Sequence, residues 1–182
     1  MDNQFKVKHE LNEIPTLEQA KRQIESYQLG ADAQAVLVAS RLMAAGAKIG
    51  HAAEIHFSRF GLSTGRYRLL ADLEDNGGEE LPSQLAEHLG VTRATVTGLI
   101  DGLERDGLVN RKASSEDGRQ KSVMLTEAGR GKLRDMAPEH FARLEAMVGS
   151  LSMEERTVFL DLLGRITGGM SALTEDGDWS RK

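Results

Sequence analysis

No cysteine occurs among the 182 residues of the chain, which excludes disulfide bonds, thiolate metal sites and thiol-based redox sensing. No apolar run approaches the ~20 residues that are needed to span a bilayer. Residues 1–6 lack the apolar core of a signal peptide. We therefore expect a cytoplasmic protein.

Motifs of catalysis and metal binding are also absent. The sequence shows no nucleophile elbow, no phosphate-binding glycine loop and no metal-ligand cluster. His51, Glu54 and His56 suggest a metal or acid–base site, but a helix would place the two histidines about 140° apart. Core or surface positions explain them better. We expect no enzymatic activity, no cofactor and no metal; a metal-dependent sensor or enzyme that uses these histidines stays as an alternative.

Charge is distributed unevenly along the chain. The net charge of −5 argues against indiscriminate DNA binding driven by bulk charge. From Leu81 to Arg134, however, nine lysine and arginine residues stand against seven acidic residues, a local excess of +2. The length suffices for one domain with a sizeable core, or for a small domain with an oligomerisation module.

Two short helical patterns follow each other after Leu81. Pro82 can open the first helix, and Gly90 ends it; its inner face consists of Leu85, Ala86 and Leu89. Thr92 is placed to cap the second helix, and Gly107 closes that helix at a position where a left-handed residue is common.

The second helix has one apolar and one small, polar face. Its inward residues recur at helical spacing: Val96, Leu99, Ile100 and Leu103. Its outward residues are Arg93, Ala94, Thr97, Gly98 and Asp101. Small residues allow the helix to approach base edges closely, and hydroxyl and guanidinium groups can bond to bases or phosphates. This pattern predicts a DNA-reading helix.

A hairpin pattern comes next. Leu108–Lys112 and Gln120–Leu125 are typical of strands, with Val123 and Leu125 on one face, and residues 114–118 have turn chemistry. Arg119 near the tip can reach a minor groove, where Asp117 can orient it. Two helices followed by a hairpin predict a winged helix-turn-helix.

These motifs resemble the MarR family of bacterial transcription regulators in order and spacing over about fifty residues. The residues that carry the resemblance are Thr92 to Thr97, Leu99 to Glu104, Gly107-Leu108-Val109 with Arg111, Asp117 with Arg119, and Leu125-Thr126 with Gly129. The resemblance implies a mainly α fold with a small β-hairpin wing and a DNA-binding regulator, most simply a repressor that an effector releases.

Helical patterns flank this region on both sides. We expect an N-terminal extension over 1–32, with an extra helix capped by Thr16, and a dimerisation helix over 33–60. The winged helix-turn-helix is expected over 61–129, with its reading helix at 92–106 and its wing at 108–126. C-terminal dimerisation helices over 130–170 and a flexible tail over 171–182 would follow. Pro138 is expected to kink its helix.

The terminal helices are too apolar for a reading domain of this size to cover, so we expect a homodimer. A two-fold axis would place the two reading helices in successive major grooves about 34–36 Å apart, on a pseudo-palindromic operator. The resemblance implies dimerisation through Ala33–Phe57 and Leu133–Met170.

Ten residues are expected to contact DNA. Arg93, Thr95, Thr97 and Gly98 would read the major groove, Asp117 and Arg119 the minor groove, and Ser83, Arg111, Lys112 and Lys121 the backbone. Thr95 is equally consistent with a structural role. A protein-interaction module that kept the fold and lost DNA binding is the alternative function.

Members of the resembled family often bind a small aromatic or phenolic anion. The cleft between the helices Ala33–Phe57 and Ser63–Glu74 is the expected place, lined by Met43, Ala47, His51, Phe57, Arg66 and Tyr67. Arg66 could pair with a carboxylate of this effector. Ordinary core and surface roles explain the same residues equally well.

Overall fold

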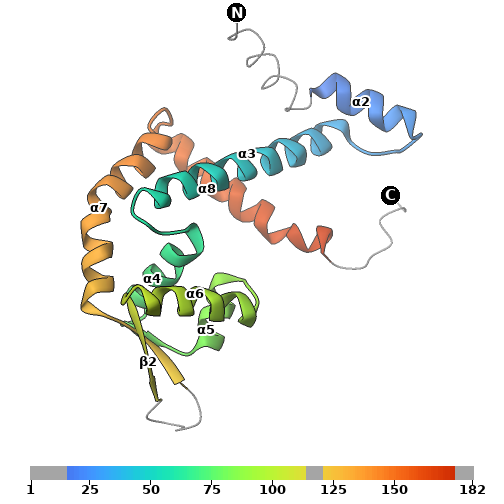
Figure 1. The fold of residues 1–182 in the computed structure, drawn as a ribbon. Coiled ribbons are helices and arrows are strands. Elements are labelled where there is room, and N and C mark those ends of the chain that lie inside the picture. Colours follow the sequence, from blue (N-terminus) through green and yellow to red (C-terminus); the bar gives the residue numbers. More distant parts are fainter. Residues whose placement is uncertain (1–15, 114–120, 175–182) are drawn as a thin grey trace, which may run out of the picture. The chain divides into compact units, whose positions relative to one another are not determined.

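The computed structural model describes residues 16–113 and 121–174, and the chain divides into two units between His56 and Phe57. The first unit contains α2 (Leu17–Ser26) and most of α3 (Ala33–Ser58) (Figure 1). Thr16 and Gln19 form a capping box at the start of α2. The Thr16 hydroxyl accepts a hydrogen bond from the Gln19 N–H at 3.2 Å, and the Gln19 side chain accepts one from the Thr16 N–H at 2.8 Å. Both predicted helices are confirmed.

Most apolar side chains of α3 are uncovered. Among its residues only Phe57 is buried, whereas Val38, Met43, Ile49 and Ile55 are each about half exposed. Within the part of the chain that the structure describes, the 26-residue helix therefore exposes apolar side chains along much of its length.

The second unit begins at Phe57 and holds the remaining elements. They are α4 (Thr64–Asp75), β1 (Glu79–Glu80), α5 (Pro82–Leu89), α6 (Arg93–Arg105), β2 (Val109–Ala113), β3 (Lys121–Leu125), α7 (Glu127–Met147), α8 (Met153–Gly168) and the 3₁₀ turn η1 (Met170–Leu173). The mainly helical fold with a small wing is confirmed. No helix within the described ranges is long and apolar enough to cross a membrane.

Local chemistry sets the limits of α5 and α6. Pro82 occupies the first turn of α5, and Gly90 ends that helix with a φ of 65°. The Thr92 hydroxyl accepts a hydrogen bond from the Thr95 N–H at 3.1 Å and caps α6, while Gly107 after α6 has a φ of 71°. These four predictions are confirmed.

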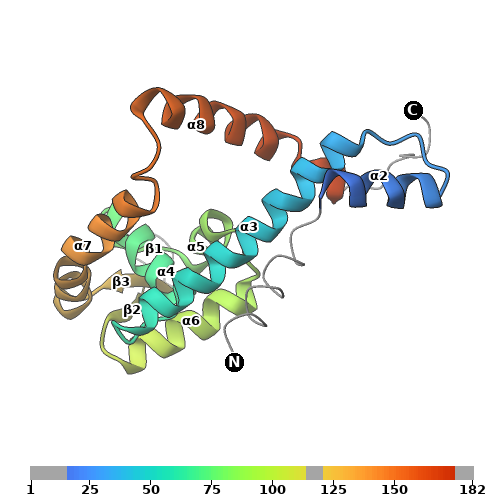
Figure 2. The ribbon, with the colours of Figure 1, turned by 90° about the horizontal axis from the view of Figure 1, so that it is seen from above.

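The sheet contains a strand that the sequence analysis missed. Its order is β1-β3-β2, with both pairs antiparallel, and Figure 2 shows the strands next to one another. Val123 of β3 lies opposite Arg111 on one side and Glu80 on the other. The hairpin strands lie within a residue of their predicted limits, and Figure 1 shows the hairpin extending away from α5 and α6.

The core of this unit joins the helices to the sheet. Its fully buried side chains come from α4, α5, α6, the hairpin and α7: Leu69, Leu70, Leu73, Leu85, Val96, Ile100, Leu103, Val109, Val123 and Met136. The predicted inner face of α6 is thus confirmed, with Leu99 half-buried at its edge. This core fixes the orientation of α6 in the second unit.

The last helices differ in how far they are covered. Pro138 lies inside α7, which remains one helix and curves along its length in Figure 1. None of the 16 residues of α8 is buried, although Ser152 and Glu155 form a capping box at its start. The η1 turn carries helical structure to Leu173, past the limit at 170 that the sequence suggested. Trp179 lies outside the described residues.

Candidate nucleic-acid interface

One face of α6 is open to solvent over its first two turns. Arg93, Ala94, Thr95, Thr97 and Gly98 are all exposed, and the opposite face is buried in the core. This is the face that the sequence predicted for reading DNA. The exposed backbone and side chains lie on a helix that packing holds in place, which is the arrangement required for entry into a major groove.

The two threonines of this face already form hydrogen bonds inside the protein. The Thr97 hydroxyl donates to the Arg93 carbonyl oxygen at 2.9 Å, so its lone pairs remain available to accept a hydrogen bond from a base. The hydroxyls of Thr92 and Thr95 lie 2.9 Å apart in a hydrogen bond. Thr95 therefore supports the start of α6 as well as facing outward.

Gly98 lies at an uncrowded point of the same face. A Cβ built at Gly98 would meet nothing within 4 Å. The protein itself therefore does not require a glycine at this position. A close approach of another molecule to the helix backbone would require one.

Arg111 on β2 connects the wing to α6. Its guanidinium forms ion pairs with Asp101 and Glu104, and its backbone N–H donates to the Glu104 carboxylate at 3.1 Å. The hydrogen bond to Asp101, followed by that to Glu104, raises the pKa of Arg111. With these partners and an exposed fraction of 25%, the side chain has a positioning role; its predicted phosphate contact stays a prediction.

The other residues predicted to contact the DNA backbone lie on the surface. Ser83 is exposed in the first turn of α5, and Lys121 is exposed at the start of β3. Lys112 is 57% exposed, with its ammonium nitrogen 3.9 Å from the Glu79 carboxylate. Asp117 and Arg119 lie outside the described residues.

The residues predicted to bind an effector separate into different environments. Met43, Ala47 and His51 are exposed on α3 in the first unit. In the second unit, the rings of Phe57 and Tyr67 stack with their centroids 4.2 Å apart. The structure therefore brings two of the six predicted residues together.

His140 of α7 completes this aromatic cluster and was missed by the sequence analysis. Its Nε2 lies 3.0 Å from the Tyr67 hydroxyl, and its ring centroid lies 5.4 Å from that of Phe57. Burial, and then the charge of Asp75, raise the pKa of Tyr67. The signal was present in the sequence, because His140 follows the buried Met136 at the helical spacing of four residues.

Arg66 does not join that cluster. Its guanidinium donates to the Asp106 carboxylate at 2.9 Å and lies so close to Gly102 that a Cβ there would overlap it. Arg66 therefore ties α4 to the end of α6. The predicted pairing of Arg66 with an effector carboxylate stays a prediction.

A pocket of about 400 Å³ lies between α4 and α7 beside the aromatic cluster. Its walls are mostly apolar, with acidic groups from α4 and basic groups from α7; it is lined by Tyr67, Ala71, Glu74, Asp75, Leu133, Arg134, Met136, Ala137, His140 and Phe141. The pocket has the size and lining of a small-molecule site.

Relatives and solved structures agree with this geometry. The sequence profile of the MarR family matches residues 62–121. The HTH-type transcriptional repressor YetL of Bacillus subtilis is 34% identical over 167 residues, which cover 91% of this chain and 99% of the relative.

Two solved structures share the fold at lower identity. Sco3205, a MarR family transcriptional regulator from Streptomyces coelicolor solved in complex with DNA, matches with a TM-score of 0.71 at 23% identity, over 77% of this chain and 89% of that one. The organohalide-sensing regulator RdhR-CbdbA1625, solved in a form bound to 2,4-dichlorophenol, matches with a TM-score of 0.68 at 18% identity, over 84% and 89%. Since the similarity to the Bacillus subtilis repressor extends over nearly the full length of both proteins, and the family profile matches the helix-turn-helix, this chain belongs to the MarR family.

Proposed function

We propose that this protein is a DNA-binding transcriptional regulator, acting as a repressor without enzymatic activity of its own. The exposed face of α6, held by a buried core and by Arg111, carries this proposal. The name of the Bacillus subtilis relative supports repression, and the Streptomyces coelicolor regulator bound to DNA supports the mode of contact. A regulator of this kind works where bacterial DNA is, in the cytoplasm.

The operator would be bound by a homodimer. Apolar side chains on α8 support this, since Val158, Phe159 and Leu160 are 58%, 49% and 68% exposed. A second copy of the chain would cover such a surface and present two α6 helices to DNA. The two-fold axis of the dimer then requires a pseudo-palindromic operator.

Selection of bound duplexes from a random DNA pool tests this function. We expect two similar half-sites in inverted order, about 10 base pairs apart from centre to centre. An Arg119→Ala variant should then bind the selected operator about 1–3 kcal/mol more weakly at fixed salt, with its circular dichroism spectrum unchanged. The matched control is Arg22→Ala on α2, which removes one positive charge outside the predicted DNA contacts. Enrichment of no sequence would reject the proposal.

The pocket between α4 and α7 supports an effector response. Its apolar wall fits an aromatic ring, and the Arg134 guanidinium, which pairs with Glu127, contributes positive charge that suits a phenolate or carboxylate. The structural relative bound to 2,4-dichlorophenol supports this ligand class. We infer that a small phenolic or anionic aromatic molecule binds here and weakens operator binding.

Calorimetric titration with 2,4-dichlorophenol and with benzoate tests the pocket. At least one probe should bind the wild-type chain and release it from its operator. Ala137→Phe fills the pocket and should abolish binding, while Ala142→Phe, exposed on the same helix and outside the lining, should not. Equal binding by both variants would exclude this pocket.

A further inference from the structure

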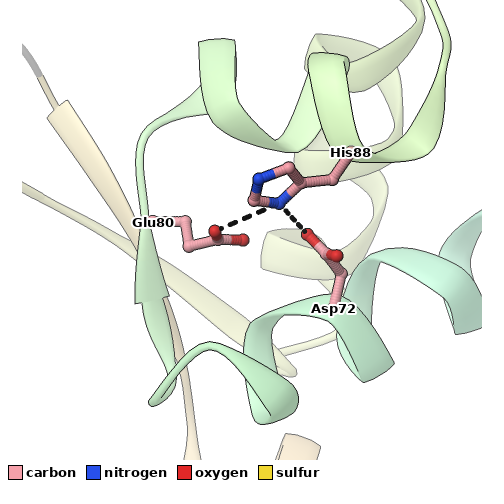
Figure 3. A group of neighbouring side chains, drawn as sticks. All are labelled: Asp72, Glu80 and His88. Carbon is pink, nitrogen blue, oxygen red and sulfur yellow. Dashed lines mark hydrogen bonds and ion pairs between the residues drawn. The ribbon is translucent and has the colours of Figure 1, made fainter.

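Three ionisable side chains meet at a point of the second unit that the proposed function does not use. Asp72 comes from the last turn of α4, Glu80 from β1 and His88 from the last turn of α5 (Figure 3). Each offers one ligand atom, and these atoms all lie within 4.8 Å of one another. The sequence analysis did not identify this group, because its members come from three separate elements.

The distances suit a single bound cation. His88 Nδ1 lies 3.1 Å from Asp72 Oδ2 and 3.3 Å from Glu80 Oε1. Ligands at about 2.0–2.2 Å from a tetrahedral zinc ion lie about 3.3–3.6 Å from one another. Both distances from His88 therefore lie within a few tenths of an ångström of the spacing between two ligands of one ion.

The Glu80 carboxylate provides a second, independent observation. Its side chain is only 6% exposed, and among the described residues no hydrogen-bond partner is found for its Oε2 atom. In Figure 3 this second oxygen lies on the side of the carboxylate that faces Asp72. A buried carboxylate oxygen without a donor is costly, and a cation at the cluster would offset that cost.

We propose that Asp72, Glu80 and His88 form a binding site for a first-row divalent transition-metal ion, with zinc the best fit. The imidazole nitrogen distinguishes this site from one for Mg²⁺ or Ca²⁺, which select oxygen ligands. Asp72 is 20% and His88 40% exposed, so the ion has access from solvent, and water completes its coordination.

A bound ion would join three consecutive elements of the helix-turn-helix. It would link α4 and β1 to α5, the helix that precedes the reading helix α6. Such a link restrains α5 at its last turn, close to Gly90 and the start of α6. Metal binding is measurable without DNA, so its failure would leave the proposed regulatory function untouched.

Calorimetric titration of the metal-free full chain with Zn²⁺, Mn²⁺ and Mg²⁺ tests the proposal. We expect one Zn²⁺ per chain, weaker Mn²⁺ binding, and no Mg²⁺ binding at the same concentrations. His88→Ala and Glu80→Gln should each weaken Zn²⁺ binding at least about tenfold. Glu80→Gln preserves the volume of the buried side chain and removes its charge, so this variant is expected to fold.

His51→Ala is the matched control, because it removes an exposed histidine on α3 instead. It should bind Zn²⁺ as the wild-type chain does. The proposal is overturned if no Zn²⁺ binds, if His88→Ala binds it unchanged, or if His51→Ala loses it. Measurable Mg²⁺ binding that is equally strong in the wild-type chain and in His88→Ala would also overturn it, since carboxylates alone would then hold the ion.

Discussion

The fold and DNA recognition place different requirements on the residue at position 98. Its surroundings are open, so the protein tolerates a side chain there, whereas a helix seated in a major groove does not. Gly98→Ala should raise the free energy of unfolding by about 0.5–1 kcal/mol, because alanine loses less backbone entropy in a helix than glycine does. The same variant should bind the operator more weakly. Urea unfolding and fluorescence anisotropy measure the two effects.

Gly164→Ala is the control for that variant. Gly164 also has open surroundings, and it lies about 140° around α8 from Phe159. It should stabilise the chain similarly and leave DNA affinity unchanged. A Gly98→Ala variant that binds DNA as tightly as wild type would mean that this face of α6 does not approach DNA closely.

Tyr67 gives a pH dependence whose sign follows from its raised pKa. The folded protein holds the phenol proton at pH values where the unfolded chain, with a pKa near 10, releases it. Its stabilising contribution is therefore complete below about pH 10 and is lost as pH rises through the folded pKa. Tyr67→Phe has no such group, so the stability of wild type relative to this variant should fall as pH rises above about 10. Urea unfolding of both proteins checks this; a constant difference would contradict it.

At the scale of elements, the connection between the wing and α6 depends on Arg111. Arg111→Ala leaves Asp101 and Glu104 without their cation and should lower the free energy of unfolding by about 1 kcal/mol, since both ion pairs are partly exposed. DNA affinity should fall because the strands and α6 lose their fixed relation. Arg111→Lys should not restore it, since an ammonium group cannot pair with two carboxylates in the same geometry.

Two measurements separate this positioning role from a phosphate contact. A lost phosphate contact reduces the slope of log affinity against log salt by about one unit, whereas a lost positioning residue changes it less. If Arg111→Ala leaves stability intact and reduces the salt slope fully, Arg111 contacts DNA directly, as the sequence analysis expected.

The elements show which features local sequence can predict. Thr92 and Thr16 were identified as caps because a capping hydroxyl bonds a backbone N–H three residues away. Gly90 was identified because a left-handed residue ends a helix locally. The strand β1 was missed because two residues carry no periodic pattern, and its pairing partner lies more than forty residues further along the chain.

Side-chain clusters depend on the same long-range pairing. Tyr67 and His140 are 73 residues apart in sequence. Asp72, Glu80 and His88 follow one another at intervals of eight residues, which matches no common metal-ligand spacing. The pairing of β1 with β3 places Glu80 beside the other two residues. The reading face of α6 was predictable because one helix carries all of it.

At the scale of the whole molecule, the apolar surface of α8 predicts the assembly. Phe159 is 49% exposed, so a charge at this position is tolerated in a single chain and costly in an interface between two copies. Phe159→Glu should shift the protein from dimer to monomer in light scattering coupled to gel filtration. Thr167→Glu, exposed on the same helix, is the control. A dimeric Phe159→Glu variant would place the interface elsewhere.

The ratio of two dissociation constants tests the central claim most directly: that a pair of α6 helices reads a specific DNA sequence. Both are measured by anisotropy at one fixed salt concentration, for the selected operator and for a random duplex of equal length. The account predicts an operator bound at least about 10³-fold more tightly, by two chains per duplex. Equal affinity for the two duplexes would contradict it.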